Sequence, residues 1–380
     1  WLAGTFAFAP ITLKPFALAL YQEGEDEDEL ELRSMDALGE LVRYGLLDRG
    51  KKGWQINHAL MHTYARNHLP LSREALERVA AYYIRWCREQ SAAGVPGYAR
   101  MDDERAHCLR LIKACLDGEL WGEVKWLEDA INEYLDRQGH WVEKLAAVEI
   151  NLTAARQAKD RRDEAWCLNS LGCISDNCGE IEQALHWYEE CLPLWRELEA
   201  RIDEGATLNN MAGIYGQQGK YEQALDHYQQ SLIIVREIGD QTEEGTILNN
   251  IGRLYRAQGD NERALSYYER SLPIHREVGN KIVEGITLNN IATIYAAQEE
   301  YSKALEYYKH ALAIVTEMGD RKLEAEDSWN IGLTYKDLGD LAKAEEYITL
   351  AVEITEQIGY PSLEEYRDGL KQVRAARRGA

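Results

Sequence analysis

Asparagine pairs recur every forty residues in this chain of 380 residues, and their side chains have the chemistry to recognise a ligand. The sequence Leu-Asn-Asn begins at Leu208, at Leu248 and at Leu288. An amide side chain both donates and accepts hydrogen bonds, so a row of amides can hold an extended peptide backbone with little dependence on the peptide's side chains. The candidate partner-binding residues in this row are Ser170, Asn209, Asn210, Asn249, Asn250, Asn289, Asn290 and Asn330.

Two arginines form a second candidate binding feature. Arg253 and Arg256 lie three residues apart within one predicted helix, in a molecule with a formal net charge of −22. Guanidinium groups bind carboxylates through paired hydrogen bonds, so the two side chains could anchor an acidic peptide. The alternative is that both arginines face solvent and pair with nearby glutamates.

The sequence does not show a motif for catalysis or metal binding. The segment from Gly213 to Lys220 resembles a phosphate-binding loop, but it is one residue too long and no Ser or Thr follows the lysine. His58 and His62 have the spacing of a zinc pair, but Ala59 stands where the metalloprotease motif has glutamate. We therefore expect that the chain is not an enzyme and holds neither a metal nor a cofactor of its own.

Composition narrows the class of partner and the compartment. The acidic balance, with a pI near 4.9, disfavours nucleic acid and anionic membranes as general partners, because both would repel the chain. The seven cysteines lack Cys-x-x-Cys spacing, which is typical of reduced thiols in a cytoplasmic protein. We find neither a secretion signal nor an apolar run of about eighteen residues. The chain starts at Trp1, so we expect it to be a piece of a longer polypeptide.

The asparagines belong to a repeated pair of helices. Five units follow one another without insertion: 163–202, 203–242, 243–282, 283–322 and 323–362. In the second unit, apolar residues spaced three and four apart predict a first helix at Glu204–Gln217 and a second at Tyr221–Ile238. Glycine at the helix ends predicts left-handed caps, at Gly179, Gly219, Gly239, Gly259, Gly279, Gly319 and Gly339, while Glu299 is the exception. Asp240, Asn280 and Asp320 are the predicted N-caps of the next first helix.

Small residues recur where the two helices of a unit should cross, and they complete a family pattern. Gly252 marks the crossing on a first helix and Ala264 on a second, with Tyr255 and Tyr268 beside them. The pattern resembles the tetratricopeptide repeat, with leucine in place of its opening tryptophan and forty residues in place of 34. Similar lengthened units with Leu-Asn-Asn occur in kinesin-light-chain-like proteins and in bacterial signalling ATPases.

This resemblance implies an all-α fold, a right-handed superhelix of helix pairs whose first helices line the concave side. It places Ser170 and the second asparagine of each pair against a bound peptide. Asparagine at that position also belongs to the general repeat consensus, so a structural role remains an alternative to partner contact.

Flanking segments complete the predicted domain organisation. We expect a separate domain at 1–70, bridging helices at 71–122, a degenerate repeat at 123–162, the five repeats at 163–362 and a capping helix at 363–380. Within the bridging segment, helices are predicted at Ser72–Gln90 and Asp102–Leu116, joined by a Gly- and Pro-containing loop at Ser91–Ala99. A polar C-terminal helix would cover the apolar end of the stack.

The first domain has the order helix, strand, wing, strand, helix. The wing tip is predicted at Asp48–Gly53 and a strand at Trp54–Ile56. With Gly45-Leu46-Leu47, His58 and Tyr64-Ala65, the segment resembles the winged-helix domain of STAND signalling ATPases of the NB-ARC type. By that resemblance His58 would approach the β-phosphate of ADP in the full-length protein. The alternative is a packing or capping role for His58, since Ala59 replaces the usual acidic residue.

Winged helices also bind DNA, and Arg49, Lys51 and Lys52 lie on the predicted wing. The stretch Asn57–His68 offers Arg66 as its clear cation, whereas typical DNA binders contact at least about six phosphates. We therefore disfavour nucleic acid as a partner.

Together these features favour the ligand sensor of a STAND-type ATPase. Such a region would bind a protein or peptide in its groove and relay the binding to an upstream nucleotide-binding domain that holds ADP or ATP. Oligomerisation would be compatible with this function. The alternative is a stand-alone adaptor or scaffold of the kinesin-light-chain kind, and a third possibility is an enzyme whose catalytic domain lies outside this chain.

Overall fold

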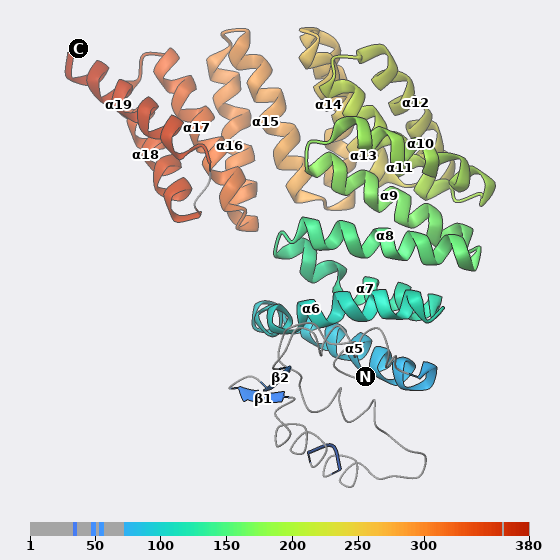
Figure 1. Cartoon of the computed structure of the whole chain (residues 1–380). Helices are drawn as coiled ribbons and strands as arrows, with labels where there is room; N and C mark the ends of the chain where they lie inside the picture. The colour runs from blue at the N-terminus through green and yellow to red at the C-terminus, as the bar shows by residue number, and fades with distance from the viewer. Residues whose placement is uncertain (1–32, 36–46, 51–52, 57–71, 359–360, 380) are drawn as a thin grey trace. The chain divides into compact units, whose positions relative to one another are not determined.

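The computed structural model describes residues 33–35, 47–50, 53–56, 72–358 and 361–379, and nearly all of these are helical (Figure 1). His58 and most of the predicted winged-helix domain lie outside the described residues. Strands β1 (Leu47–Gly50) and β2 (Gly53–Ile56) form an antiparallel pair in which Leu47 lies opposite Ile56. The strand at Trp54–Ile56 agrees with the prediction. The predicted wing tip was too long, because Asp48–Gly50 pair as strand with Gly53–Gln55.

The helices form two compact units, residues 1–198 and 199–380. In the first unit each helix packs against the next in the sequence. Its helices are α5 (Arg73–Ala92), α6 (Val95–Asp117), α7 (Trp121–Arg137), α8 (Trp141–Ala158), α9 (Arg161–Asn177) and α10 (Ile181–Glu197). In Figure 1, α7, α8 and α9 lie in successive layers.

The loop predicted at Ser91–Ala99 is wrong in length. α5 continues to Ala92 and α6 begins at Val95, so the connection is Ala93 and Gly94. Pro96 lies in the first turn of α6, where a missing N–H costs nothing because that donor has no partner inside the helix. Gly94 has φ +65°, which glycine adopts without a steric penalty, and this sharp turn makes the short connection possible.

The second unit consists of nine described helices in antiparallel succession. They are α11 (Arg201–Gln217), α12 (Tyr221–Ile238), α13 (Gln241–Ala257), α14 (Asn261–Val278), α15 (Lys281–Ala297), α16 (Tyr301–Met318), α17 (Arg321–Asp337), α18 (Leu341–Ile358) and α19 (Leu363–Gly379). The odd-numbered helices α11 to α17 are the first helices of their repeats. The second helix of the second repeat has the predicted bounds, whereas its first helix begins three residues earlier than predicted, at Arg201 instead of Glu204.

Caps explain why the helices begin and end at a fixed period. Asp240 Oδ1 accepts a hydrogen bond from the Glu243 N–H at 3.0 Å, and Asn280 and Asp320 cap α15 and α17 in the same way. The glycines predicted at the helix ends have φ between +72° and +86°. Glu299 adopts φ +62° without being a glycine. The left-handed cap also persists at three helix ends equivalent to Gly239 where another residue replaces glycine, namely Glu119, Lys159 and Glu199.

The two helices of a repeat approach closely at the small residues. Gly252 on α13 and Ala264 on α14 are fully buried, and a Cβ added at Gly252 would lie 2.6 Å from the Tyr268 ring. Tyr268 is itself buried in the same cluster as Leu248, so the glycine gives the aromatic ring its room. Packing of this density is typical of protein interiors.

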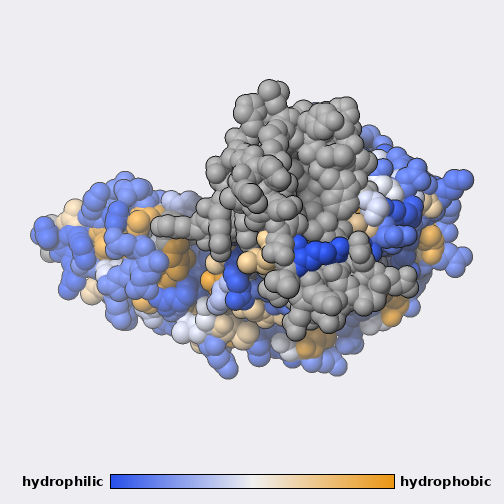
Figure 2. All heavy atoms as spheres, turned by 60° about the horizontal axis from the view of Figure 1, so that its bottom comes forward, coloured by the Kyte–Doolittle hydropathy of each residue, from blue (hydrophilic) through white to orange (hydrophobic). Residues whose placement is uncertain are grey.

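The first helices of the second unit lie side by side on one face. α11 contacts α13, α13 contacts α15, and α15 contacts α17 across the intervening second helices. We call this surface the first-helix face. Hydrophilic side chains predominate on the described surface that Figure 2 turns toward the viewer.

Candidate functional site

The predicted asparagines join successive repeats through their side chains. Asn250 Nδ2 donates to Asn209 Oδ1 at 3.1 Å, Asn290 Nδ2 to Asn249 Oδ1 at 3.5 Å, and Asn330 Nδ2 to Asn289 Oδ1 at 3.5 Å. In each case the asparagine at the second position donates to the first asparagine of the repeat before it; in the fifth repeat Trp329 replaces the first asparagine. We call this series the asparagine ladder. It runs along the first-helix face from α11 to α17.

The first asparagine of each pair is tied more deeply into the repeats. Asn249 is 5% exposed and also accepts a hydrogen bond from Thr287 Oγ1 at 3.2 Å. Asn289 Nδ2 donates to Asp327 Oδ1. These contacts give Asn209, Asn249 and Asn289 a role in holding neighbouring repeats in register.

The asparagine at the second position keeps its side-chain oxygen available to a ligand. Asn250, Asn290 and Asn330 are half-buried, and no described residue donates a hydrogen bond to their Oδ1 atoms. One amide oxygen per repeat therefore remains able to accept from a peptide N–H. Asn210 is also half-buried and makes a polar contact of its own. Ser170 is half-buried on α9, which belongs to the first unit.

Four predicted residues meet at one pocket between α15 and α17. Arg256, Asn289, Asn290 and Asn330 line a cavity of about 330 Å³ together with Thr293, Asp327 and residues of the flanking helices. In the sequence, the three asparagines belong to the predicted amide row and Arg256 to the separate arginine pair. The structure shows that they converge on a concave site with amide, hydroxyl, guanidinium and carboxylate groups.

Asp327 is a site residue that our sequence analysis missed. It is 2% exposed, Oδ1 accepts from Asn289, and no described residue donates to Oδ2. Burial raises the pKa of this carboxyl to about 7, while the Asn289 hydrogen bond acts in the opposite direction. Cys167, Thr207, Ile247 and Thr287 occupy the same position in the other repeats, so a carboxylate there was a visible departure from the pattern.

Arg253 and Arg256 lie close to a buried tyrosine. Burial raises the pKa of Tyr268 to about 12, and the positive charges of both arginines oppose that rise. Arg253 is exposed and Arg256 is half-buried, and neither forms an ion pair with a carboxylate of the described residues. The alternative, in which nearby glutamates pair with both arginines, is therefore not supported by any ion pair among the described residues.

Other kinds of site were sought in the described part of the chain. It contains no group of three or more His, Cys, Asp or Glu side chains arranged to hold a metal ion. None of its helices combines the length and apolar character needed to cross a membrane. All seven cysteines are free thiols, of which Cys178 is exposed and Cys173 half-buried.

Comparison with known families identifies the repeats. One model of the tetratricopeptide repeat matches residues 203–277 and 283–357, and another matches residues 165–199. No curated protein sequence matches the chain.

Solved structures share the fold at low sequence identity. A Signal Transduction ATPase with Numerous Domains (STAND) protein with a tetratricopeptide repeat sensor, from Pyrococcus horikoshii, is 17% identical with a TM-score of 0.58. The similarity covers 96% of this chain and 59% of that protein, so this chain spans less than two thirds of it. Aspartyl phosphate phosphatase F from Bacillus subtilis is 15% identical with a TM-score of 0.53, covering 93% of this chain and 86% of that one. A Rap protein complexed with competence and sporulation factor is 14% identical with a TM-score of 0.51, covering 80% and 99%.

These matches agree with the forty-residue period, the helix pairs and the small residues at their crossings. The predicted fold class, an all-α array of tetratricopeptide helix pairs, is confirmed for the described helices. Residues 165–199, 203–277 and 283–357 are tetratricopeptide repeats.

Proposed function

We propose that this chain is the ligand-sensing region of a STAND-type signalling ATPase, and that it binds a protein or peptide along the first-helix face. The observation that supports this best is the asparagine ladder with its pocket between α15 and α17. The ladder fixes one amide per repeat in a defined orientation and leaves its oxygen available. A regular series of such acceptors suits the regular series of N–H groups in an extended peptide.

The two arginines would select the ligand. Arg253 is exposed next to the ladder residue Asn250, and Arg256 lines the pocket. Because neither forms an ion pair with a described carboxylate, an acidic side chain of the ligand would gain a charge-assisted hydrogen bond without displacing one. We therefore expect a peptide with at least one acidic residue near the third repeat.

Signal relay would use the coupling between repeats. A ligand that contacts several repeats favours one arrangement of the stack, and it can shift a two-state equilibrium by the difference in its affinity for the two states. The upstream partner in this proposal is a nucleotide-binding domain that holds ADP or ATP, with His58 near the nucleotide. This chain would contribute no chemical step, and it would act in the cytoplasm, where such a switch has its nucleotide.

The groove can be tested by affinity capture with the full chain. We expect Arg253→Glu to lose the partner recovered by the wild type, and Asn250→Ala to weaken its recovery. Arg270→Glu is the matched control, because it makes the same change of charge on α14, a second helix outside the first-helix face. In the wild type, the Arg270 guanidinium lies over the Tyr267 ring. Recovery of the same partners by the wild type and by Arg253→Glu would contradict the groove assignment.

The adaptor of the kinesin-light-chain kind remains the second candidate, since its repeats share the lengthened unit and the Leu-Asn-Asn sequence. The full-length gene separates the two functions. A sensor requires Walker A and Walker B sequences upstream of this chain, and their absence from the gene would exclude the ATPase proposal while leaving the groove proposal intact.

A further inference from the structure

A second pocket lies in the first unit, between α7, α8 and α9, at an equivalent place in the repeat. It has a volume of about 250 Å³. Five of its lining residues lie 160 positions, or four periods, before residues that line the pocket of α15 and α17. In order, they are Lys125, Trp126, Asp129, Asp163 and Trp166, which correspond to Gly285, Ile286, Asn289, Leu323 and Glu326. The helix pairs therefore form the same kind of cavity in both units, but the first unit lines it with two tryptophans and three carboxylates.

Glu128 occupies a core position of the repeat. The first four of the five following repeats have leucine at this position, each 1% exposed, and the fifth has the buried Ser328. The four leucines are Leu168, Leu208, Leu248 and Leu288. Glu128 is also 1% exposed, so a carboxyl replaces an apolar side chain at the same depth. Burying a carboxyl in place of leucine lowers stability, because the group loses its hydration. Such a substitution is expected where a site requires the carboxyl.

One buried acceptor that lines this pocket has no partner among the described residues, and the buried carboxyl beside it has no described cation to pair with. Asn151 Nδ2 donates to Glu128 Oε2 at 3.4 Å, but Asn151 Oδ1 receives no hydrogen bond from a described residue although Asn151 is 1% exposed. Glu128 forms no ion pair within the described part of the chain. The neighbouring carboxylates differ, because Asp129 pairs with Arg88 at 3.2 Å and Asp163 pairs with Lys125 at 3.2 Å.

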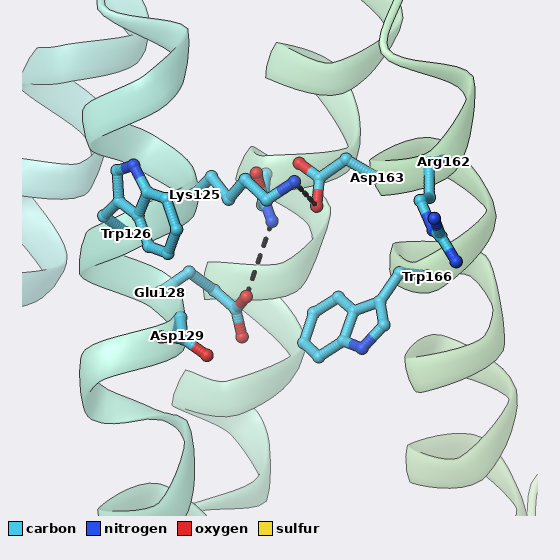
Figure 3. Close-up of a pocket in the computed structure, with 8 residues that line it drawn as sticks. Lys125, Trp126, Glu128, Asp129, Arg162, Asp163 and Trp166 are labelled. Atoms are coloured by element: carbon cyan, nitrogen blue, oxygen red, sulfur yellow. Dashed lines mark hydrogen bonds and ion pairs between the residues drawn. The ribbon is translucent and has the colours of Figure 1, made fainter.

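The tryptophans flank these acceptors. Figure 3 shows Trp126 on α7 and Trp166 on α9 at opposite sides of the pocket, with the Glu128 carboxyl between them and Lys125 directed toward Asp163. Indole faces attract cations through their quadrupole. Trp126 already makes such a contact, since the Arg88 guanidinium lies 5.2 Å from its ring centroid. The pocket thus combines aromatic walls with one unsatisfied amide oxygen and one buried carboxyl.

We propose that this pocket binds a primary ammonium group on an alkyl chain, such as a lysine side chain of a partner or a free alkylamine. An ammonium has three N–H donors, so one group can serve Glu128 and Asn151 Oδ1 together. Its methylene chain would contact the indoles. A trimethylated ammonium has no N–H and would leave Asn151 Oδ1 unsatisfied, so the site should prefer the unmodified amine. An anion would instead face three carboxyl groups, with Lys125 already engaged and Arg162 exposed at the rim.

Ligand binding at this site should be coupled to the loss of a proton from Glu128. Burial, together with the carboxylates of Asp129 on α7 and Asp163 on α9, raises the pKa of Glu128 to about 8, while Lys144 and the Asn151 hydrogen bond on α8 act in the opposite direction. Lys125 and Arg162 are the other charged groups that line the pocket. At neutral pH the carboxyl is mostly protonated, and a bound ammonium favours its ionised form. Binding should therefore release a proton and tighten as the pH rises toward 8 and above.

Calorimetric titration of the full chain with Nα-acetyl-lysine N-methylamide tests the proposal. We expect binding that is at least tenfold weaker at pH 6.5 than at pH 8.5, and no binding of the uncharged norleucine analogue or of the trimethyllysine analogue at matched concentrations. A titration with n-butylamine shows whether the natural ligand is a free alkylamine or a lysine side chain of a partner protein. Equal affinity for n-butylamine and the lysine derivative indicates a free amine, and tighter binding of the lysine derivative indicates a protein side chain. No heat from either amine at pH 8.5 would overturn the proposal.

Glu128→Leu separates binding from folding. It introduces the leucine found in four of the five following repeats, so we expect it to fold, to raise the midpoint of thermal unfolding, and to lose at least tenfold in affinity for the lysine derivative. Trp166→Leu should also lose about tenfold. Glu149→Gln is the matched control, because it removes an exposed carboxylate from α8 outside the pocket and should bind as the wild type does. Unchanged affinity in Glu128→Leu would refute the site.

Discussion

Asn250 Nδ2 lies 3.1 Å from Asn209 Oδ1, so a side chain of one repeat is held by the repeat before it. The same contact recurs from Asn290 to Asn249 and from Asn330 to Asn289. Hydrogen bonds of this kind align neighbouring first helices in register, which apolar contacts alone do less specifically. The candidate binding residues are therefore also part of the coupling between repeats.

Asn289 should be the most important member of the ladder for stability. Asn289→Ala removes the hydrogen bonds to Asn330 and Asp327 and leaves the buried Asp327 carboxyl without a described donor. Leaving a buried polar group unsatisfied costs about 1–3 kcal/mol, so we expect a loss of this size in the free energy of unfolding measured in urea at pH 7. Asn330→Ala is the control, because it removes one contact of 3.5 Å and should cost less than about 1 kcal/mol. Equal losses in the two variants would contradict this ranking.

Asp327 should make the chain less stable as the pH rises. Burial raises its pKa to about 7 from the usual 3.8, so between pH 4 and 7 the folded state binds more protons than the unfolded state. Stability contributed by a raised pKa is present below the unfolded value and is lost as the pH rises through the folded value, with a slope of at most about 1.4 kcal/mol per pH unit. Asp327→Asn removes this pH-dependent contribution to stability, and the amide oxygen of the new side chain can still accept the Asn289 hydrogen bond.

Urea unfolding at pH 5, 6, 7 and 8 measures the effect as a difference between variant and wild type. The free energy of unfolding of Asp327→Asn should exceed that of the wild type by a growing margin from pH 5 to pH 8. A constant margin over this range would show that the Asp327 pKa is close to its ordinary value. Other titrating groups contribute equally to both proteins, so their effect on the pH dependence cancels in the difference. One such group is Glu345, whose pKa is held down by Arg377 and Arg374.

The repeat period made the helices predictable because several boundaries have a local chemical cause. Asp240 caps α13 and glycines such as Gly239 end the preceding helix, and these effects depend on residues within one turn. The start of α6 was missed because its local signal, a proline, has two meanings. Pro96 was interpreted as part of a loop, whereas proline is also tolerated in the first turn of a helix, and sequence alone does not distinguish the two.

The site was only partly predictable, because its contacts join different repeats. The sequence shows that Asn289 and Asn290 recur, but the bond from Asn330 to Asn289 depends on the rotation of one first helix against the next. Glu128 and Asp327 left a visible trace, since each puts a carboxyl where other repeats have uncharged residues. A comparison of repeats position by position finds such exceptions, but their pKa values require the burial that only the structure supplies.

Gly252 and Gly213 should respond oppositely to alanine, although they lie on neighbouring first helices. A Cβ at Gly252 would meet the buried Tyr268 ring at 2.6 Å, and we expect Gly252→Ala to cost about 1–2 kcal/mol in the free energy of unfolding because the ring must move. A Cβ at Gly213 would have Tyr228 OH as its nearest contact at 3.7 Å. Gly213→Ala should therefore stabilise by up to about 1 kcal/mol through helix propensity. Destabilisation by both would show that the first-helix face is more tightly packed than these distances indicate.

The C-terminal helix α19 should stabilise the second unit through its apolar face rather than its charges. Tyr366 stacks on Trp329 with ring centroids 4.4 Å apart, and Leu370 and Val373 are buried in the same cluster. On the other side, Arg374 and Arg377 each lie 2.8 Å from a Glu345 oxygen, but both arginines are about half exposed. Exposed ion pairs contribute about 0–1 kcal/mol, whereas truncating a buried aromatic side chain to alanine costs about 3–5 kcal/mol.

We therefore expect Tyr366→Ala to lower the free energy of unfolding by about 3 kcal/mol, and the double variant of Arg374→Ala and Arg377→Ala to lower it by less than about 1 kcal/mol. Hydrogen exchange locates the effect: amides of α17 and α18 should lose protection in Tyr366→Ala, because a terminal helix in a repeat array protects the neighbours that it covers. A larger loss from the arginine double variant than from Tyr366→Ala would mean that charge, rather than burial of the apolar face, holds α19 against the last repeat.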